Sequence, residues 1–581
     1  MVGSTVTHQD DLHESPLAGL ISIGPRTGHR VRTSIRLPAW TAPAAHRTIA
    51  KNKHDAAQAS EPPVNRTPEH DATTAGAPEH LDVLIVGAGI SGIDAAYRLQ
   101  TECPGKRFAL LEAREAIGGT WDFFRYPGIR SDSDMSTLGF PFRPWRAARA
   151  LAAGDEIRDY VQDTARQYGI DRQVRLGWRV VRAAWCSREA RWTVDVQVGP
   201  EQPASRLTCD FLYLCSGYYD YARGHSPTFP GAERFGGRIV HPQDWPADLD
   251  YSGQRVVVIG SGATAVTLVP ALTERATHVT LLQRSPTYIV SRPRDDRLAR
   301  WAQANLPATL ADRLVRWANI GLGIATYRFC RTFPERARAA ILAGVRRALG
   351  PGHDVERHFT PRYKPWDQRI CLVPDGDLFR ALRQGKASIA TDRIEHFTET
   401  GVQLAGGDHL DADLIVTATG LVLKMAGGAE LEMDGRAIDP ARRMVYRGMM
   451  LEGVPNLAIA FGYSNASWTL RCDLTARHVC RLLNYMDRHG YRYCLAPPDA
   501  SLRPRPLLDF SSGYVRRADA VLPRQGSRAP WRVHQNYLLD WAAFVFGRPD
   551  DGVMRFFRTP AKSDRTDKTA ITEKHPNEET R

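Results

Sequence analysis

The sequence predicts an α/β protein with two separate domains built on parallel sheets, together with a helical insertion. Two stretches predict the sheets: LDVLIVGAGISGIDAAYRLQ, from Leu81, and RVVVIGSGATAVTLVPAL, from Arg255. Each is an apolar run, a glycine-rich turn and a helical pattern, which together form the β-turn-α unit of parallel sheets. The length of the chain agrees with more than one domain, because 581 residues are too many for one ordinary hydrophobic core.

The composition excludes several classes of protein. Hydrophobic residues make up 43% of the chain, which excludes wholesale disorder. The nine cysteines include no CxxC pair, which argues against a disulfide framework, a dithiol redox centre or a metal site, and fits a reducing cytosol. The net charge of +13 is spread along the chain, so we expect anionic cofactors and no nucleic acid. No segment looks able to span a bilayer or act as a secretory signal, so we expect a cytoplasmic protein.

The first glycine-rich turn has the features of a dinucleotide-binding site. It reads GxGxxG, a pattern that permits a tight turn, close approach of a pyrophosphate and close helix packing: Gly87, Gly89 and Gly92. The free N–H groups of the following helix start, with Ser91 beside them, face the phosphates. The next predicted strand ends in Glu112, whose carboxylate accepts hydrogen bonds from ribose hydroxyls and repels a 2′-phosphate. This site is predicted to bind FAD or NAD rather than NADP.

The residues that follow favour FAD. A glycine pair after the acidic strand end is a habit of FAD-binding oxidoreductases, and here it opens GGTWDFFRYPGIRSDSDMSTLGFPFRPW, from Gly118 to Trp145. This stretch resembles the active-site segment of the Baeyer–Villiger flavin monooxygenases, most closely the ethionamide-activating kind. The resemblance implies cofactor contacts from seven of its residues: Gly119, Thr120, Trp121, Asp122, Arg130, Ser131 and Asp132.

The second glycine-rich turn is predicted to bind NADPH. It reads GxGxxA, and the residues expected at the cofactor are Gly260, Ser261, Gly262, Ala263, Thr264, Ala265 and Val266. The following strand ends in Gln283-Arg284-Ser285, where Arg284 and Ser285 replace the acid of the first site. Arginine offers a planar fork to a 2′-phosphate, so NADPH is preferred over NADH. The alternative is that Arg284 is a surface arginine in an arginine-rich chain.

Between the two turns lies FGGRIVHPQDWP, which matches the FxGxxxHxxxWP fingerprint of the Baeyer–Villiger monooxygenases at every fixed position. In that family the segment links the domains and responds to the flavin and the nicotinamide. The resemblance therefore implies a supporting role for His241 rather than proton transfer on the substrate.

The resemblance also implies a catalytic arginine that precedes a cysteine by two residues, here Arg369 before Cys371. A fixed cation stabilises both an anionic C4a-peroxyflavin and a negatively charged tetrahedral adduct. Its expected partner is Asp132, which holds the guanidinium in place. One departure matters, because Gln368 stands where many family members have lysine, which puts one expected cofactor contact in doubt.

The function implied is NADPH- and dioxygen-dependent conversion of small hydrophobic ketones to esters or lactones, with oxygenation of sulfides or thioamides at the same site. Three alternatives stay open, the first within the same class of enzyme and the other two outside it. An N- or S-oxygenating flavin monooxygenase has no carbonyl chemistry, and a disulfide reductase requires the cysteine pair that is absent here. A non-catalytic module binds FAD and NADP only.

The domain order follows from these motifs. Residues 80–217 and 385–560 are predicted to form two parts of the FAD domain, with the NADPH domain, 218–384, inserted between them. Residues 1–79 and 561–581 are predicted to be disordered. The segment from about 296 to 349 is rich in Arg, Leu and Ala at helical spacing. Two interpretations stay open for it: a solvated helix pair that covers the sheet, which we favour, or a basic amphipathic surface that touches a membrane.

Overall fold

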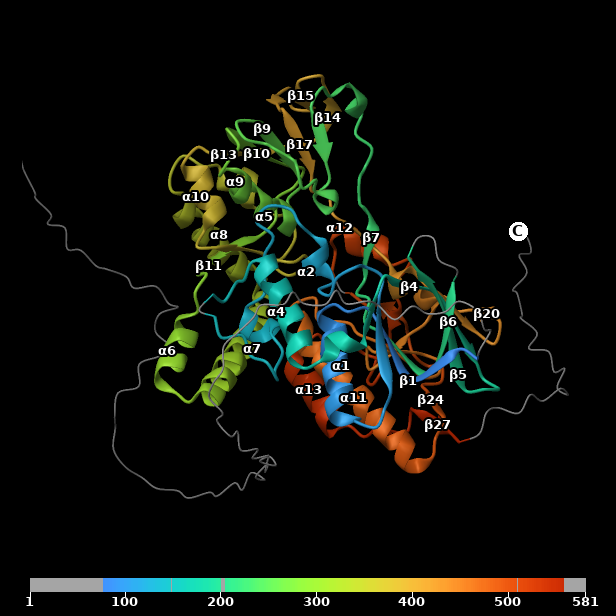
Figure 1. The fold of residues 1–581 in the computed structure, drawn as a ribbon. Helices are drawn as coiled ribbons and strands as arrows, with labels where there is room; N and C mark the ends of the chain where they lie inside the picture. Colours follow the sequence, from blue (N-terminus) through green and yellow to red (C-terminus); the bar gives the residue numbers. More distant parts are fainter. Residues whose placement is uncertain (1–76, 148, 200–203, 509, 559–581) are drawn as a thin grey trace, which may run out of the picture. The chain divides into compact units, whose positions relative to one another are not determined.

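The computed structural model describes residues 77–147, 149–199, 204–508 and 510–558, all within one compact unit. The predicted disordered segments lie outside this range, except that residues 77–79 are described and Glu79 begins the first strand. The described chain contains two large sheets with helices packed against them (Figure 1), which confirms the predicted α/β class.

The first large sheet has nine strands. Its order is β20 (Arg436–Ala437), β19 (Glu430–Met433), β4 (Trp178–Cys186), β5 (Arg191–Val198), β6 (Ser205–Leu214), β1 (Glu79–Val86), β2 (Phe108–Glu112) and β3 (Val174–Leu176), with β23 (Leu457–Ile459) also paired to β6. The strands β23, β6, β1, β2 and β3 are parallel, whereas β5 is antiparallel to both β4 and β6. Strand β6 is therefore paired along both of its edges. One edge pairs with β1, and the other pairs first with β5 and then with β23.

Alternate residues of β1 point to opposite faces of this sheet, as strand geometry requires. Val83 and Ile85 belong to the core on one side, which also contains residues of α1 (Ile90–Glu102), α4 (Gly154–Gln167) and α11 (Trp468–His489). Leu84 and Val86 belong to the core on the other side. Both faces of the parallel strands are thus buried, which explains the continuous apolar run in the sequence.

The second large sheet has five strands, all parallel. Its order is β13 (Ala387–Thr391), β10 (His278–Gln283), β9 (Arg255–Ile259), β17 (Leu414–Thr417) and β8 (Arg238–Val240). Helix α5 (Ala263–Leu272) packs on one face through the core that contains Val256 and Val258. Between β13 and β17 the chain forms a small antiparallel sheet of three strands: β14 (Ile394–Phe397), β15 (Gly401–Leu404) and β16 (His409–Asp411).

Two neighbouring strands carry the chain between the sheets. Strand β7 (Tyr219–Gly224) precedes the five-stranded sheet, β18 (Leu421–Leu423) follows it, and the two pair in antiparallel fashion. The peptide N–H of His225 donates to the carbonyl of Gly420 at 3.0 Å. This hydrogen bond extends the β7–β18 pair at the end where the chain enters and leaves the five-stranded sheet.

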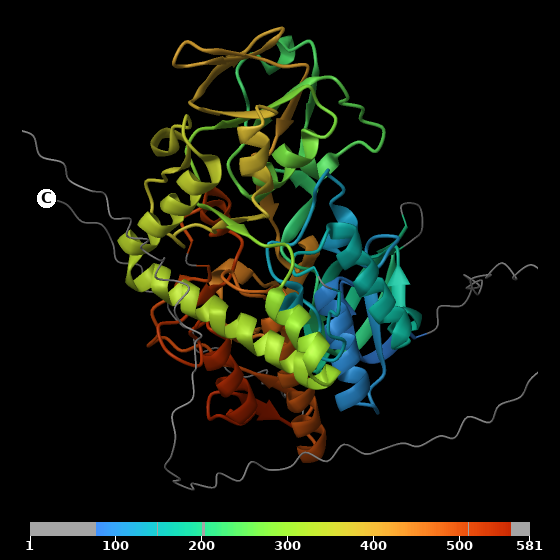
Figure 2. The same cartoon turned by 90° about the vertical axis from the view of Figure 1, so that its left-hand side faces the viewer.

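The helical insertion consists of α6 (Arg297–Asn305), α7 (Ala308–Thr332) and α8 (Pro334–Leu349). Arg316 anchors α7 by donating to the carbonyls of Ser136 and Gly139, at 2.8 and 2.9 Å. Figure 2 shows this yellow-green helical segment on the side of the described chain that faces the viewer. Within the described ranges, no helix is both long enough and apolar enough to cross a membrane.

Candidate active site

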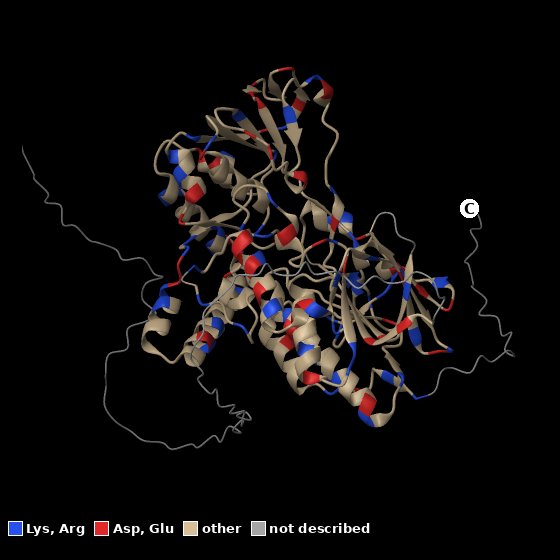
Figure 3. Ribbon diagram, viewed as in Figure 1, with Lys and Arg blue, Asp and Glu red and all other residues tan. Residues whose placement is uncertain are grey.

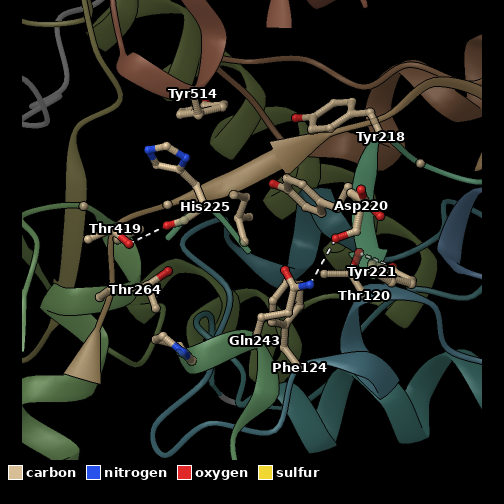
Figure 4. Close-up of a pocket in the computed structure, with 18 of the residues that line it drawn as sticks. Thr120, Phe124, Tyr218, Asp220, Tyr221, His225, Gln243, Thr264, Thr419 and Tyr514 are labelled. Carbon is tan, nitrogen blue, oxygen red and sulfur yellow. Dashed lines mark hydrogen bonds between the residues drawn. The ribbon is translucent and has the colours of Figure 1, made fainter. Parts of the chain in front are cut away.

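One cavity of about 1540 Å³ is lined by residues from both large sheets. This volume exceeds the 300–1,000 Å³ typical of a site for one small ligand, so the cavity can hold more than one. The carboxyl ends of β1 and β9 both open onto it, as expected for ligand sites of open α/β sheets. Figure 4 shows lining side chains from both regions, among them Thr120 and Thr264.

Both glycine-rich turns leave helix N-termini open to the cavity. Gly89 is the N-cap residue of α1, and Gly262 is the N-cap residue of α5. At neither helix start does a side chain cap the free N–H groups, and neither helix has an acidic residue in its first turn. Both glycines line the cavity. Free N–H groups at a helix start bind phosphates, so the two turns fit the two predicted dinucleotides.

The first glycine of each turn is required by its neighbours. Gly87 has φ +104°, and a Cβ there would lie 2.7 Å from the carbonyl oxygen of Cys215. Gly260 has φ +145°, and a Cβ there would lie 2.3 Å from the carbonyl oxygen of Ala418. Each turn therefore packs directly against the end of a neighbouring parallel strand, in the same way in both sheets.

Glu112 ends β2 beside the first turn and lines the cavity. Its Oε2 accepts a hydrogen bond from the peptide N–H of Ala88 at 2.8 Å, and its Oε1 accepts one from that of Arg114 at 3.0 Å. Burial raises the pKa of this carboxyl, while the two peptide groups oppose that effect. Each oxygen keeps a further lone pair, so the carboxylate can still accept from a ribose hydroxyl.

Arg284 and Ser285 lie at the end of β10 and line the cavity. Arg393 also lines it, just beyond the end of the neighbouring strand β13. The two strand ends run side by side, because the peptide N–H of Asp392 donates to the carbonyl of Gln283 at 3.0 Å. Neither guanidinium makes an ion pair with a described residue. Two unpaired cations therefore stand where a 2′-phosphate is expected, and the sequence pattern identified only the first.

Arg369 and Asp132 form a bidentate ion pair at the cavity. The Arg369 Nη2 and Nε atoms each lie 2.8 Å from a different oxygen of Asp132. Asp132 raises the pKa of the guanidinium above its already high usual value, so Arg369 stays charged. The expected pairing is present, and 37% of the Arg369 side chain remains exposed at the cavity that it lines.

Three phenols stand near this cation. Tyr218 and Tyr219, around the start of β7, and Tyr514 of α12 (Gly513–Ala518) line the same cavity. Burial raises the pKa of each phenol, so all three are neutral near pH 7. No sequence motif identified them, although Tyr218 and Tyr219 directly follow residue 217, where the first part of the FAD domain is predicted to end.

His241 lines the cavity where the chain passes between the sheets. Its Nε2 lies 3.3 Å from the carbonyl oxygen of Gly420, and its Nδ1 accepts from the peptide N–H of Gln243 at 3.2 Å. Burial lowers its pKa. Both ring nitrogens thus contact backbone, which suits a residue that supports the link between domains.

Most of the remaining predicted site residues line the cavity: Gly119, Thr120, Trp121, Arg130, Ser131, Ser261, Ala263 and Thr264. Several of the lining residues also have partners within the protein. For example, Arg130 pairs with Asp377 at 2.6 Å, and the Ser91 hydroxyl accepts a hydrogen bond from Trp468 at 2.8 Å.

Four predicted cofactor residues do not line the cavity: Gly92, Asp122, Ala265 and Val266. Asp122 is buried and forms ion pairs with Arg114 and Arg125, both at 2.6 Å. The other three are buried within α1 and α5. They support the turns from behind rather than contact the space in front of them.

This arrangement, with two dinucleotide cradles opening on one cavity that contains a fixed cation, defines a flavoprotein oxidoreductase with a second nucleotide site. The Flavin-binding monooxygenase-like family model matches residues 81–299. The chain is 54% identical over 485 residues to FAD-containing monooxygenase EthA of Mycobacterium tuberculosis, covering 83% of this chain and 99% of that protein. It is 49% identical over 486 residues to putative FAD-containing monooxygenase MymA of the same species, covering 82% and 98%. The chain belongs to this family of FAD-containing monooxygenases.

Solved structures agree on the fold. An oxidized steroid monooxygenase bound to NADP matches with a TM-score of 0.66 and 23% identity, covering 83% of this chain and all of that one. This similarity confirms the two Rossmann-like domains. The identity to EthA confirms the flavin monooxygenase family that the motifs indicated.

Proposed function

We propose that the protein uses NADPH and dioxygen to insert one oxygen atom into small hydrophobic ketones, giving esters or lactones, while the second atom leaves as water. Sulfides and thioamides are proposed as further substrates. When bound, FAD supplies the redox chemistry that activates dioxygen. The observation that carries the proposal is the Arg369–Asp132 pair, which lies in the cavity that both glycine-rich turns share.

The roles of the chain's own residues follow from this geometry. Asp132 holds Arg369 at two points, so the guanidinium is oriented before substrate arrives. A fixed cation stabilises the negative charge that develops on the carbonyl oxygen during attack. The neutral phenols of Tyr218, Tyr219 and Tyr514 provide an uncharged aromatic wall beside that cation, which favours an apolar substrate.

Arg369→Ala tests the proposal, with Arg362→Ala as the control because Arg362 is an exposed arginine of the same segment. We expect the visible flavin spectrum and NADPH oxidation to persist in Arg369→Ala, while ester formation falls by roughly two to three orders of magnitude. Ester formation at the rate of the control would refute the role of Arg369. Oxidation of sulfides by the unmodified enzyme, with no ester from any ketone, would favour the N- or S-oxygenating alternative.

A further inference from the structure

Exposed apolar side chains are concentrated on the helical insertion and on α13 (Tyr537–Phe546). Among the described residues, all but three of the exposed large hydrophobic side chains lie on α6, α7, the start of α8 or α13; the three others are Leu176, Ile239 and Phe557. Scattered apolar residues are ordinary on a protein surface, but a concentration of this kind marks an interaction site.

Helices α7 and α13 bring these side chains together. Leu310, Leu314 and Trp317 follow one another at the i, i+4, i+7 spacing of a single helix face. The ring centroid of Trp317 lies 6.3 Å from that of Trp541, which lies 5.6 Å from Phe546. Val545, one turn beyond Trp541, completes what we call the α7–α13 face: Leu310, Leu314, Trp317, Trp541, Val545 and Phe546.

Apart from Trp541, which also packs against the core around α11, this face is not what holds the two helices on the protein. Helix α7 buries a different side, which contains Ala311, Val315 and Ile320. Helix α13 buries Asp540 and Phe544 against α11, where Asp540 pairs with the buried Arg471. Phe546 remains 73% exposed and Trp317 44% exposed. Except for Trp541, the α7–α13 face is therefore apolar surface beyond what the fold itself uses.

Helices α6 and α7 carry an excess of positive charge. Residues 297–332 contain six arginines and one acid, Asp312. Figure 3 colours the charged residues of these helices on the ribbon. Four of these arginines are exposed and pair with no acid among the described residues: Arg297, Arg300, Arg313 and Arg328. The ten residues of α13 contain one charge, Asp540, which points inward. The face thus combines exposed tryptophan, leucine and phenylalanine with unpaired cations.

We propose that the α7–α13 face docks on the surface of an anionic lipid bilayer. Helices that lie in a membrane interface present tryptophan, phenylalanine and leucine to the acyl boundary and arginine to the headgroups. A second copy of the chain is a poorer fit, because a symmetric contact would bring two arginine-rich surfaces together.

The face also lies behind the wall of the cavity. Ile320 of α7 packs with Tyr463, and Ile324 and Tyr537 pack against the same cluster. Tyr463 lines the cavity, while Tyr537 contacts Trp317 at 5.8 Å between ring centroids. A docked protein would therefore hold its cavity within a few side-chain layers of the lipid, from which an apolar compound could be drawn.

Flotation of the full-length holoenzyme with vesicles tests the proposal. We expect binding to phosphatidylcholine vesicles that contain phosphatidylglycerol, weaker binding to phosphatidylcholine alone, and loss of binding as salt is raised. The Trp317→Ser/Phe546→Ser variant should bind about tenfold more weakly or worse, because two large apolar side chains no longer enter the interface. Arg300→Glu/Arg313→Glu should lose the preference for the anionic vesicles.

Leu176→Ser is the matched control, since Leu176 is 39% exposed but lies on β3, outside the face. It should bind as the unmodified protein does. Flavin content and thermal midpoint show that each variant is folded. Absence of binding by the unmodified protein, or equal binding by all variants, overturns the proposal. A dimer in light scattering that Trp317→Ser/Phe546→Ser dissociates would assign the face to a second copy instead.

Discussion

Removal of the two arginines at the ends of β10 and β13 tests how the second nucleotide site reads its ligand. Arg284 and Arg393 line the cavity, are exposed and pair with no acid among the described residues. Alanine at either position therefore breaks no ion pair or side-chain hydrogen bond with a described residue, and the fold should be unaffected. Any loss of nucleotide affinity should reflect a lost contact with the nucleotide itself.

The magnitude follows from the type of contact. A charge-assisted hydrogen bond from arginine to phosphate contributes about 1.5–3 kcal/mol, which is roughly a ten- to hundred-fold change in affinity. Arg284→Ala should raise the NADPH Michaelis constant by that factor and leave NADH use nearly unchanged, because NADH lacks the 2′-phosphate. Arg393→Ala should act in the same direction. The double variant should show an effect that differs from the product of the two single effects, because neighbouring groups that share a ligand are coupled.

Steady-state kinetics with both nucleotides provide the assay. Arg238→Ala is the control, because Arg238 is an exposed arginine at the opposite end of the same sheet, on β8. An equal loss for NADPH and NADH in Arg284→Ala would mean that this residue holds the fold or the pyrophosphate. An effect confined to Arg284→Ala, with Arg393→Ala like the control, would remove Arg393 from the site.

Gly87→Ala should release FAD, whereas Gly260→Ala should weaken NADPH binding and keep the flavin spectrum. In each variant the new Cβ meets a carbonyl oxygen, and the positive φ costs about 1–3 kcal/mol for a residue other than glycine. Loss of flavin in both variants would contradict separate sites for the two cofactors. Burial and the neighbouring Asp473 raise the pKa of Asp94 well above 3.8. The unfolded chain then ionises before the folded one, so stability falls as pH rises from about 4 toward the raised pKa. Asp94→Asn should therefore raise the thermal midpoint more at pH 8 than at pH 5, and an equal shift at both would contradict the buried neutral carboxyl.

Local features of the fold could be predicted from the sequence, because they depend on the geometry of residues that are close together in the chain. The first strand, turn and helix follow from GxGxxG, and Glu112 ends β2 as the motif requires. The apolar run that predicts β1 begins at Leu81, whereas the strand itself begins two residues earlier, at Glu79. Glu79 and His80 belong to the strand because they pair with Leu207 and Thr208 of β6, and no local pattern reveals how far a partner strand extends.

Contacts between residues that come together only through the order of strands in a sheet could not be predicted from the sequence. Arg393 lies beside the Arg284 region because β13 pairs with β10, although more than a hundred residues separate them in the chain. Tyr514 reaches the cavity from a short helix near the C-terminus, with no motif around it. The two residues of the Arg369–Asp132 pair are 237 positions apart in the chain, and the pair was predicted only through the resemblance to a family.

The paired strands β7 and β18 have a consequence for the way this chain can be divided. The segment that builds the five-stranded sheet begins and ends at one place, where His225 and Gly420 are joined by a hydrogen bond of 3.0 Å. A short turn could close that gap, so residues 225–420 could be excised as a cassette, and the flanking halves could be spliced into one continuous chain. The same adjacency would let the corresponding cassette of a relative be transplanted without lengthening either connection.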